Sequence, residues 1–539
     1  MSRVNVELNR FIFVEDLYSL PKLPKEPFVV LALLLVVTLD TVAGSSRADL
    51  SLILNVFIAF LTGAFMFNKK TNENLSKEQR AAIESIPADT RTVLDKFNIL
   101  PTYIPYACCP KCFALYAPTK LPDKSREPFY PRKCTFKTTP NSSPCDTSLL
   151  VERHDGAGRS SAPPDNGSPL GCGEFWKPRK IFAYQTMQSW LGRLYSRPRF
   201  EEYFDAAWDC AKPGVDIWGA DVLQSFLGPN GERFSIRPPG HSHLVFSLFV
   251  DWFNPYGNKQ AGKSYSSGAI YMICLNLPIH LRYQLENVYL VGVIPGPTEP
   301  SLAEINHFLR PLVDALCQLW QTGFWLSRTA ACPAGRLVRG ALIPLVCDLP
   351  ALRKTAGFTG HMSNLFCSFC NLSRKDIQNF DRASWPKKHT WEEHLRYATQ
   401  WRDAASDSDR EKLASRYGVR WSELLRLEYW DPTKFSLLDS MHNLFLGELQ
   451  HHCRNVWQMN IKSPKTRILL PHDINKQNQQ LDSGIKAIVT GSASALKKLR
   501  KGYLAALAWE NAVRVGGSRR VKDFIEALIQ WVCQLKPHK

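Results

Sequence analysis

Two aspartates close apolar runs in the middle of the chain. Asp251 follows His243–Val250, and Asp348 follows Ala341–Cys347. Each run has the length and composition of a buried central strand. Carboxylates at the ends of neighbouring strands can bridge a pair of Mg²⁺ ions, which activate water or a hydroxyl for attack on a phosphodiester. The alternative is that each aspartate only starts a turn or caps the next segment.

Cysteines in the first third of the chain have the spacing of metal ligands. Cys109 and Cys112 are separated by two residues, and Cys134 and Cys145 follow. A two-residue gap lets both thiolates reach one tetrahedral Zn²⁺, so the four residues predict a ribbon-like zinc site. The last gap, of ten residues, is longer than usual. Buried thiols without a metal are therefore the alternative.

A second cysteine pair, Cys367 and Cys370, follows the Asp348 segment. The remaining zinc ligands could come from His442, or from His451 and His452. Zinc at this position would clip the charged insertion that follows onto the sheet. Redox chemistry or simple burial of the two thiols is the competing interpretation.

Composition indicates a folded protein with a polyanionic partner. The 539 residues are 45% hydrophobic and carry a formal charge of +18, which predicts two to four domains and an attraction to phosphates. The chain does not open with a secretory signal, so its 15 cysteines are expected in a reducing compartment, where metal binding is more common than disulfides.

Two strongly apolar segments lie near the N-terminus, at Phe28–Val37 and Leu50–Phe67. The second is long enough to cross a membrane. Charged residues lie between the two segments, at Asp40, Arg47 and Asp49. We therefore predict a buried helical hairpin, with a membrane segment as the alternative.

The remaining patterns predict five regions of mixed α/β character. A meander of three strands is expected from His243–Val250, Gly268–Leu275 and Val288–Ile294, followed by a helix over Ser301–Thr322 that Pro311 should kink or split. The predicted regions are a helical segment at 1–100, a cysteine-rich module and linker at 101–175, a helical DNA-binding or connecting segment at 176–240, an α/β domain at 241–460 with an insertion at 376–430, and a basic helical region at 461–539.

Several linked motifs resemble the Tnp2-type transposases of CACTA elements, a family abundant in mushroom-forming fungi. Asp251–Asn258 (DWFNPYGN) resembles the first-acid motif of that family, although Trp252 stands where the family usually has glycine. Further similarity lies, in the same order, in Leu275–Pro278 (LNLP), Val293–Pro300 (VIPGPTEP), Cys347–Ala351 (CDLPA), Cys367–Cys370 (CSFC) and Leu438–Gly447 (LDSMHNLFLG).

The resemblance implies an RNase-H-like catalytic domain of the DDE/D type with a zinc-clipped insertion. Asp251 and Asp348 would then be the first two metal-binding acids. The third is Asp439 or, as its rival, Glu510 on a later helix. If His442 is a zinc ligand, Asp439 would only orient it.

By the same resemblance, the chain would be a nuclear protein that cleaves and joins double-stranded DNA at the terminal repeats of an element. Mg²⁺ or Mn²⁺ would serve catalysis and Zn²⁺ the structure, and a homo-oligomer is compatible with this reading. The alternative is a catalytically inactive remnant that binds DNA or protein. The replacement of glycine by Trp252 leaves that alternative open.

Overall fold

The computed structural model comprises two compact units, residues 1–450 and 451–539. Each unit is described by itself. The structure describes residues 11–14, 24–67, 74–97, 99, 101–119, 129–152, 176–209, 216–255, 265–457, 459, 471–516 and 520–535.

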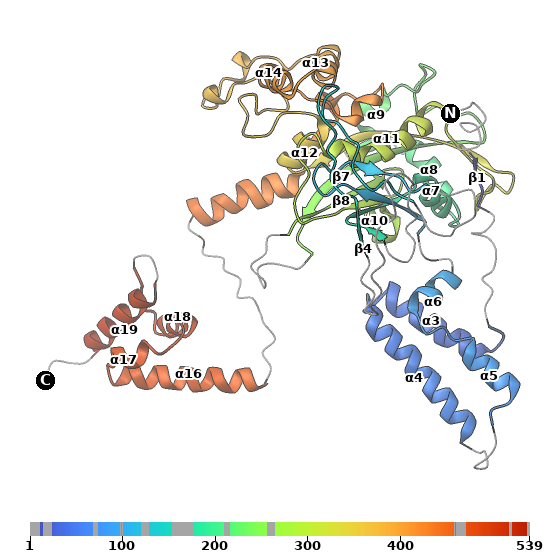
Figure 1. Ribbon diagram of the computed structural model, residues 1–539. Coiled ribbons are helices and arrows are strands. Elements are labelled where there is room, and N and C mark those ends of the chain that lie inside the picture. Colours follow the sequence, from blue (N-terminus) through green and yellow to red (C-terminus); the bar gives the residue numbers. More distant parts are fainter. Residues whose placement is uncertain are drawn as a thin grey trace. The chain divides into compact units, whose positions relative to one another are not determined.

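Four helices form a cluster near the N-terminus, with its own apolar core. Pro27 occupies the first turn of the first helix, where its missing N–H costs nothing, and Ser46 caps the second by accepting from the Asp49 N–H. These helices are α3 (Pro27–Thr41), α4 (Arg47–Met66), α5 (Lys77–Glu84) and α6 (Thr90–Lys96) (Figure 1).

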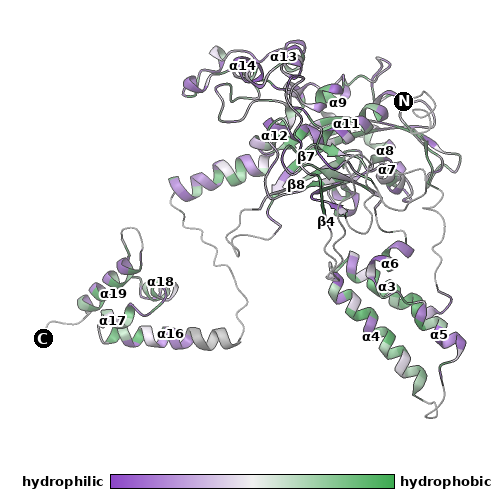
Figure 2. Cartoon of the chain, in the orientation of Figure 1, coloured by the Kyte–Doolittle hydropathy of each residue, from purple (hydrophilic) through white to green (hydrophobic). Residues whose placement is uncertain are grey.

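The predicted hairpin is present as α3 and α4, but the prediction that it is buried is wrong for the outer face of α4. Only 17% of the apolar stretch of α4 is buried, and Leu52, Val56 and Phe60 are exposed. Figure 2 shows the apolar character of both helices. Among the described residues, α4 is the one helix long and apolar enough to cross a membrane by length and composition.

A large mixed sheet forms the centre of the first unit. The predicted meander is confirmed: β7 (His241–Phe253), β8 (Ser267–Cys274) and β9 (Tyr289–Ile294) pair antiparallel in succession. Two later strands then run parallel to β7. They are β11 (Arg336–Cys347), which pairs with β7, and β12 (Ser436–Leu438), which pairs with the end of β11.

Helices connect these strands and cover the sheet. The helix α11 (Ile305–Gln321) leads from the meander to the short strand β10 (Phe324–Leu326), which precedes β11. It continues through Pro311, so the predicted split is absent. Its apolar stripe is buried against β11. The helix α12 (Leu349–Ala356) follows β11 directly and ends at Gly357, whose φ of +84° fits a left-handed C-cap.

The sheet extends beyond the region predicted for the α/β domain. On the β9 side it continues through strands from the cysteine-rich and connecting regions, and on the β11 side through two short strands. In order along the sheet these are β6 (Ile181–Gln185), β2 (Tyr103–Cys108) and β3 (Leu115–Tyr116) on one side, and β10 (Phe324–Leu326) and β1 (Phe11–Ile12) on the other.

Smaller helices complete the first unit. Three precede β7, one connects β8 to β9, and the rest lie in the charged insertion or directly before β12. They are α7 (Met187–Tyr195), α8 (Phe200–Asp209), α9 (Asp221–Gln224), α10 (Ile279–Arg282), α13 (Trp391–Asp403), α14 (Asp407–Tyr417) and α15 (Pro432–Phe435).

The second unit is helical, as the sequence predicts. Its apolar core includes Leu504, Leu507 and Leu528. The helices that supply this core are α16 (Pro471–Val489), α17 (Ala493–Leu496), α18 (Lys501–Glu510) and α19 (Val521–Leu535).

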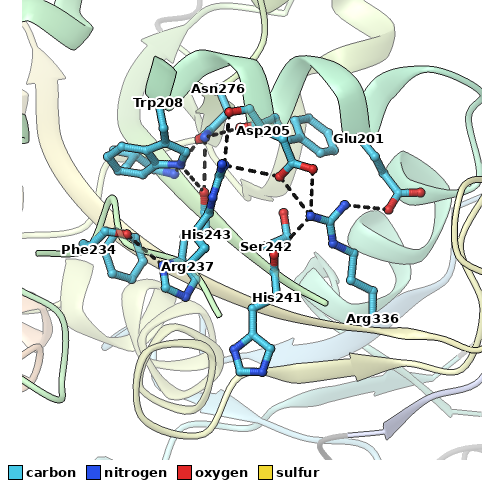
Figure 3. Close-up of polar contacts among 12 residues, drawn as sticks. Glu201, Asp205, Trp208, Phe234, Arg237, His241, Ser242, His243, Asn276 and Arg336 are labelled. Carbon is cyan, nitrogen blue, oxygen red and sulfur yellow. Dashed lines mark hydrogen bonds and ion pairs between the residues drawn. The ribbon is translucent and has the colours of Figure 1, made fainter. Parts of the chain in front are cut away.

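A buried ion-pair network ties the start of β11 to α8 (Figure 3). Arg336 donates to Glu201 at 2.8 Å and to both carboxylate oxygens of Asp205 at 2.8 Å. It also donates to the backbone carbonyl of His241, the first residue of β7. A buried guanidinium that is paired on several sides fixes the relative position of the elements that surround it.

Side chains also bond to the backbone at the start of β7 (Figure 3). The Trp208 indole N–H and the Asn276 amide both donate to the His243 carbonyl, at 2.9 and 3.2 Å. The Asn276 oxygen in turn accepts from the Val245 N–H at 2.8 Å. These bonds hold the strand between α8 and the end of β8.

We predict that Glu201→Ala lowers the free energy of unfolding of the first unit by about 3 kcal/mol or more, because it leaves the buried Arg336 without one of its carboxylates. Glu202→Ala is the matched control, because Glu202 is the next residue in the chain and its side chain is 68% exposed. Urea unfolding of the full chain measures both. Similar midpoints for the two variants would contradict the role given to this network.

Candidate functional site

The register between β7 and β11 brings two predicted acids to the same level. Leu248 pairs with Leu345 across these parallel strands. Three residues further along each chain stand Asp251 and Asp348. Asp251 lies within β7 and is exposed, whereas Asp348 directly follows β11 and is half-buried. Asp251 and Asp348 are therefore neighbours at the same end of two adjacent strands.

A β-bulge in β11 produces this alignment. The pairing shifts by one residue between Leu342, which opposes Phe246, and Leu345, which opposes Leu248. The extra residue lies beside Pro344, which has no N–H to donate, as is typical of proline in a sheet. Because side chains alternate along a strand, the shift determines whether Asp348 lies on the same face of the sheet as Asp251.

Two aromatic side chains satisfy the backbone groups that the bulge releases. The Leu342 N–H donates to the Tyr429 hydroxyl at 2.9 Å, and the fully buried Trp430 donates its indole N–H to the Ile343 carbonyl at 3.0 Å. The bulge is thus held by residues just before β12, because an unpaired buried backbone group would be costly.

The third strand adds another predicted acid. Cys347 pairs with Leu438, the last residue of β12, and the next residue, Asp439, donates its N–H to the Cys347 carbonyl at 2.9 Å. The structure therefore brings Asp251, Asp348 and Asp439 to the ends of three neighbouring parallel strands. The buried Cys347 thiol lies beneath them, and its pKa is raised by burial and by the three carboxylates.

Each carboxylate already accepts a hydrogen bond from the backbone. Asp251 accepts from the Trp252 N–H, and Asp348 accepts from the Ala351 N–H, both at 2.8 Å. Asp348 is therefore the N-cap of α12, as the capping interpretation expects; its metal-binding role stays a prediction. A cap uses one carboxylate oxygen and fixes the side chain, so it is compatible with a second task.

Asp439 forms a pair with His442, one helical turn later. The His442 ring donates Nδ1–H to one oxygen of Asp439, and the Met441 N–H donates to the other at 3.0 Å. Burial alone would raise the pKa of Asp439, but these hydrogen bonds outweigh burial and lower it. The pKa of His442 is raised by the bond to Asp439 and further by the charges of Asp439, Asp251 and Asp348. The His442 imidazole therefore interacts electrostatically with all three carboxylates.

Trp252, which replaces the family's usual glycine, is accommodated by a glycine on the neighbouring strand. Trp252 pairs with Gly268 of β8, and a Cβ on Gly268 would lie 2.5 Å from the indole ring. The Lys354 ammonium lies over the same ring, 4.6 Å from its centroid. The tryptophan therefore packs in the space that a side chain at position 268 would fill. Only the pairing of the two strands could have revealed this exchange.

Glu510, the rival for the third acid, is an exposed residue of α18 in the second unit. His451 and His452 also belong to that unit. Their predicted roles stay predictions.

The four cysteines of the first cluster converge. Their sulfur atoms all lie within 4.8 Å of one another, with Cys109 and Cys145 at 3.8 Å and Cys112 and Cys134 at 3.4 Å. Four sulfurs bound to one tetrahedral Zn²⁺ at about 2.3 Å would lie roughly 3.8 Å apart. The cluster could therefore hold a metal such as zinc.

The electrostatics of the cluster also fit a cation. Burial raises the pKa of Cys112 well above that of a free thiol, so its thiolate is unstable without a partner. Against the effect of burial, hydrogen bonds from Thr147 and from neighbouring thiols lower the pKa of Cys145 to about 7. A metal would replace the thiol protons and neutralise the charge.

The structure does not bring the second cysteine pair, Cys367 and Cys370, together with the described His442 as a set of metal ligands. Within the described parts of the chain, no other set of three or more potential ligands lies as close together as the first four cysteines. The neighbour of the pair is instead Lys388, which donates to the Cys367 carbonyl at 3.1 Å. Burial lowers the pKa of Lys388 to about 8. The zinc role of the pair stays a prediction.

We predict that the purified chain carries zinc and that Cys112→Ser removes one equivalent of it, because three thiolates hold the ion less tightly than four. Cys108→Ser is the matched control: Cys108 is buried next to the cluster but is not one of its members. Metal analysis by mass spectrometry gives the stoichiometry. Equal zinc content in the two variants would contradict the assignment.

One family matches the chain. Residues 238–415 match the sequence model described as transposase family tnp2. The matched segment starts just before β7 and ends within α14, so it contains Asp251, Asp348 and the Cys367–Cys370 pair. No curated protein matches the chain. This central segment, about a third of the chain, is therefore similar to the tnp2 family of transposases.

Proposed function

We propose that this transposase-derived protein cleaves and joins DNA strands, using divalent metal bound by Asp251, Asp348 and Asp439. The observation that carries the proposal is the level arrangement of these three residues at the ends of β7, β11 and β12. Strand ends are rigid, and acids held there keep their spacing when substrate binds. The match of residues 238–415 to a transposase family also favours DNA as the substrate.

The order of the strands supports an RNase-H-like catalytic domain. An antiparallel meander, β7–β8–β9, is followed by two strands, β11 and β12, that join its β7 side in parallel. The helix α11 forms the crossover between the meander and β11. We infer that the three acids occupy the metal-binding edge of such a domain.

Oxygen ligands at this edge suit Mg²⁺ or Mn²⁺, which accept carboxylates readily. When bound, such ions polarise the phosphate and lower the pKa of an attacking water. The exposed Asp251 faces the solvent from which DNA must arrive, and the cap of α12 fixes the carboxylate of Asp348. The bond from His442 keeps Asp439 ionised.

The reaction then has two steps. In the first, water attacks the phosphorus at the element end and the bond to the 3′ oxygen breaks, which leaves a 3′ hydroxyl and a 5′ phosphate. In the second, that 3′ hydroxyl attacks a phosphodiester of the target DNA and displaces another 3′ oxygen. The first step hydrolyses one phosphodiester, and the second exchanges one phosphodiester for another. Both displace a 3′ oxygen from phosphorus, so one site can serve for both.

Charge and cysteine chemistry support the remaining parts of the proposal. A net charge of +18 favours double-stranded DNA with its phosphates, and the terminal repeats of the element are the expected sites. The tetrahedral cysteine cluster would hold structural Zn²⁺. DNA as substrate implies a nuclear location, and joining two element ends favours a homo-oligomer.

We predict that Asp251→Asn and Asp348→Asn each reduce Mg²⁺-dependent nicking of terminal-repeat DNA by roughly a thousandfold. Loss of a metal ligand forfeits several kcal/mol of transition-state stabilisation, and each 1.4 kcal/mol is about tenfold in rate. Asp376→Asn, an exposed aspartate in the insertion, is the control and should nick at the wild-type rate. The rates come from gel analysis of labelled duplexes.

The same assay separates an enzyme from an inactive remnant. If wild-type protein binds the duplex but neither it nor the variants nick it, the nuclease proposal is withdrawn and DNA binding alone remains. Equal nicking by wild type and Asp251→Asn would lead to the same withdrawal.

The third acid is decided by a second comparison. We predict that Asp439→Asn abolishes nicking whereas Glu510→Gln leaves it unchanged, because Asp439 follows the strand that pairs with β11. Nicking measured with Mg²⁺ and with Mn²⁺ tests both variants. A loss confined to Glu510→Gln would assign the role to α18 and leave Asp439 as the partner of His442.

A further inference from the structure

An apolar pocket of about 520 Å³ opens beside the three acids. Its floor comes from β7, β11 and β12, and its walls come from the segment around α9 and from the residues that follow α10. Side chains that define it include Val222, Ser247, Phe249, Tyr283, Phe435 and Asp439. The pocket therefore contains one of the proposed metal ligands in its own lining.

The pocket and the acids share one face of the sheet. Successive side chains of a strand point to opposite faces, so Ser247, Phe249 and Asp251 of β7 lie on the same face. Leu437 and Asp439 are related in the same way at the end of β12. A ligand that contacts the floor of the pocket is thus directly beside the carboxylates.

Ser247 supplies a polar group inside this apolar space. The residue is only 2% exposed, it lines the pocket, and its hydroxyl has no hydrogen-bond partner. A buried hydroxyl without a partner costs about 1–3 kcal/mol. A ligand with a polar edge would recover that energy, whereas a purely apolar ligand would not.

The rim has the character of a nucleotide-binding surface. Val222 and Tyr283 are 42% and 60% exposed, and both offer apolar area to a planar ligand. Lys434 also lines the pocket; its side chain is 72% exposed and forms an ion pair with Asp431 at 3.4 Å. The lining thus combines apolar walls, one hidden polar group and one cation.

We propose that this pocket receives a single unpaired base of the DNA strand, next to the phosphate that is cleaved at the three acids. The proposal rests on the proposed function, because it takes DNA as the substrate of the same site. A base has two apolar faces and a polar edge, and it is joined to a phosphate. The apolar walls, Ser247 and Lys434 match these three parts. Stacking in the pocket offsets the few kcal/mol needed to unpair a base.

The experiment compares DNA with a matched and with a mismatched base pair at each position near a terminal-repeat end. A mismatch removes most of the cost of unpairing. We expect the wild-type chain to bind one particular mismatched duplex about tenfold more tightly than the matched one. Fluorescence anisotropy with Ca²⁺ in place of Mg²⁺ measures both affinities.

Three variants test the pocket itself. Val222→Trp fills it from the exposed rim and should bind matched and mismatched duplexes equally. Leu227→Trp is the control, because Leu227 is 53% exposed and lies outside the lining, and it should keep the tenfold preference. Ser247→Ala should reduce the preference to about threefold without lowering the unfolding midpoint, since it deletes a hydroxyl that has no partner.

The outcomes are distinct from those of the nicking assay. A tenfold preference that persists in Val222→Trp overturns the pocket proposal, as does a wild-type chain without any preference, and the nuclease proposal is then unaffected. A wild-type chain that binds neither duplex removes both proposals.

Discussion

The one-residue bulge in β11 is the constraint on which the proposed site depends. Before the bulge Leu342 faces Phe246, and after it Leu345 faces Leu248, so the pairing gains one residue between them. Without that extra residue Asp251 would stand level with Cys347, and Asp348 would point to the opposite face of the sheet. Bulges that aim a side chain are common next to functional sites. Here the device is held by hydrogen bonds from Tyr429 and Trp430 to the neighbouring backbone.

The sequence predicts the strands of the centre but not the way they are aligned. Long apolar runs are visible without a structure, and β7, β8, β9 and β11 form where such runs occur; those of β7 and β11 end in an acid. Register depends on partners far away in the chain, so neither the bulge nor the pairing of Trp252 with Gly268 could be predicted. The strand β12 has only three residues, too few to show a period. The outer face of α4 also escaped prediction, because composition alone does not reveal what covers a helix.

The two groups of candidate ligands, the four cysteines and the three aspartates, differ in how far apart their members lie in the sequence. The cysteine cluster is predictable in part, since Cys109 and Cys112 are neighbours in sequence and their gap fits a single turn. It is joined to the same sheet as the acids, because Cys108 ends β2, which reaches β9 through β6. A metal in the cluster would thus brace an outer part of the sheet. The three aspartates come from strands 97 and 91 residues apart in the chain, so only the folded sheet unites them.

Departures from good local packing occur on the face of the sheet that carries the acids. Beside Asp251, Asp348 and Asp439 lie a buried hydroxyl without a partner at Ser247, a half-buried Phe249 and an exposed Leu437. The other face of β7, by contrast, carries fully buried Phe246 and Leu248 in the main core. Folding alone would favour covering the first face as well, since exposed apolar groups and orphan hydroxyls lower stability. Natural proteins break local rules mainly where a ligand or substrate must enter. The defects beside the acids are therefore where a ligand could be accommodated, and this argument uses neither charge nor family similarity.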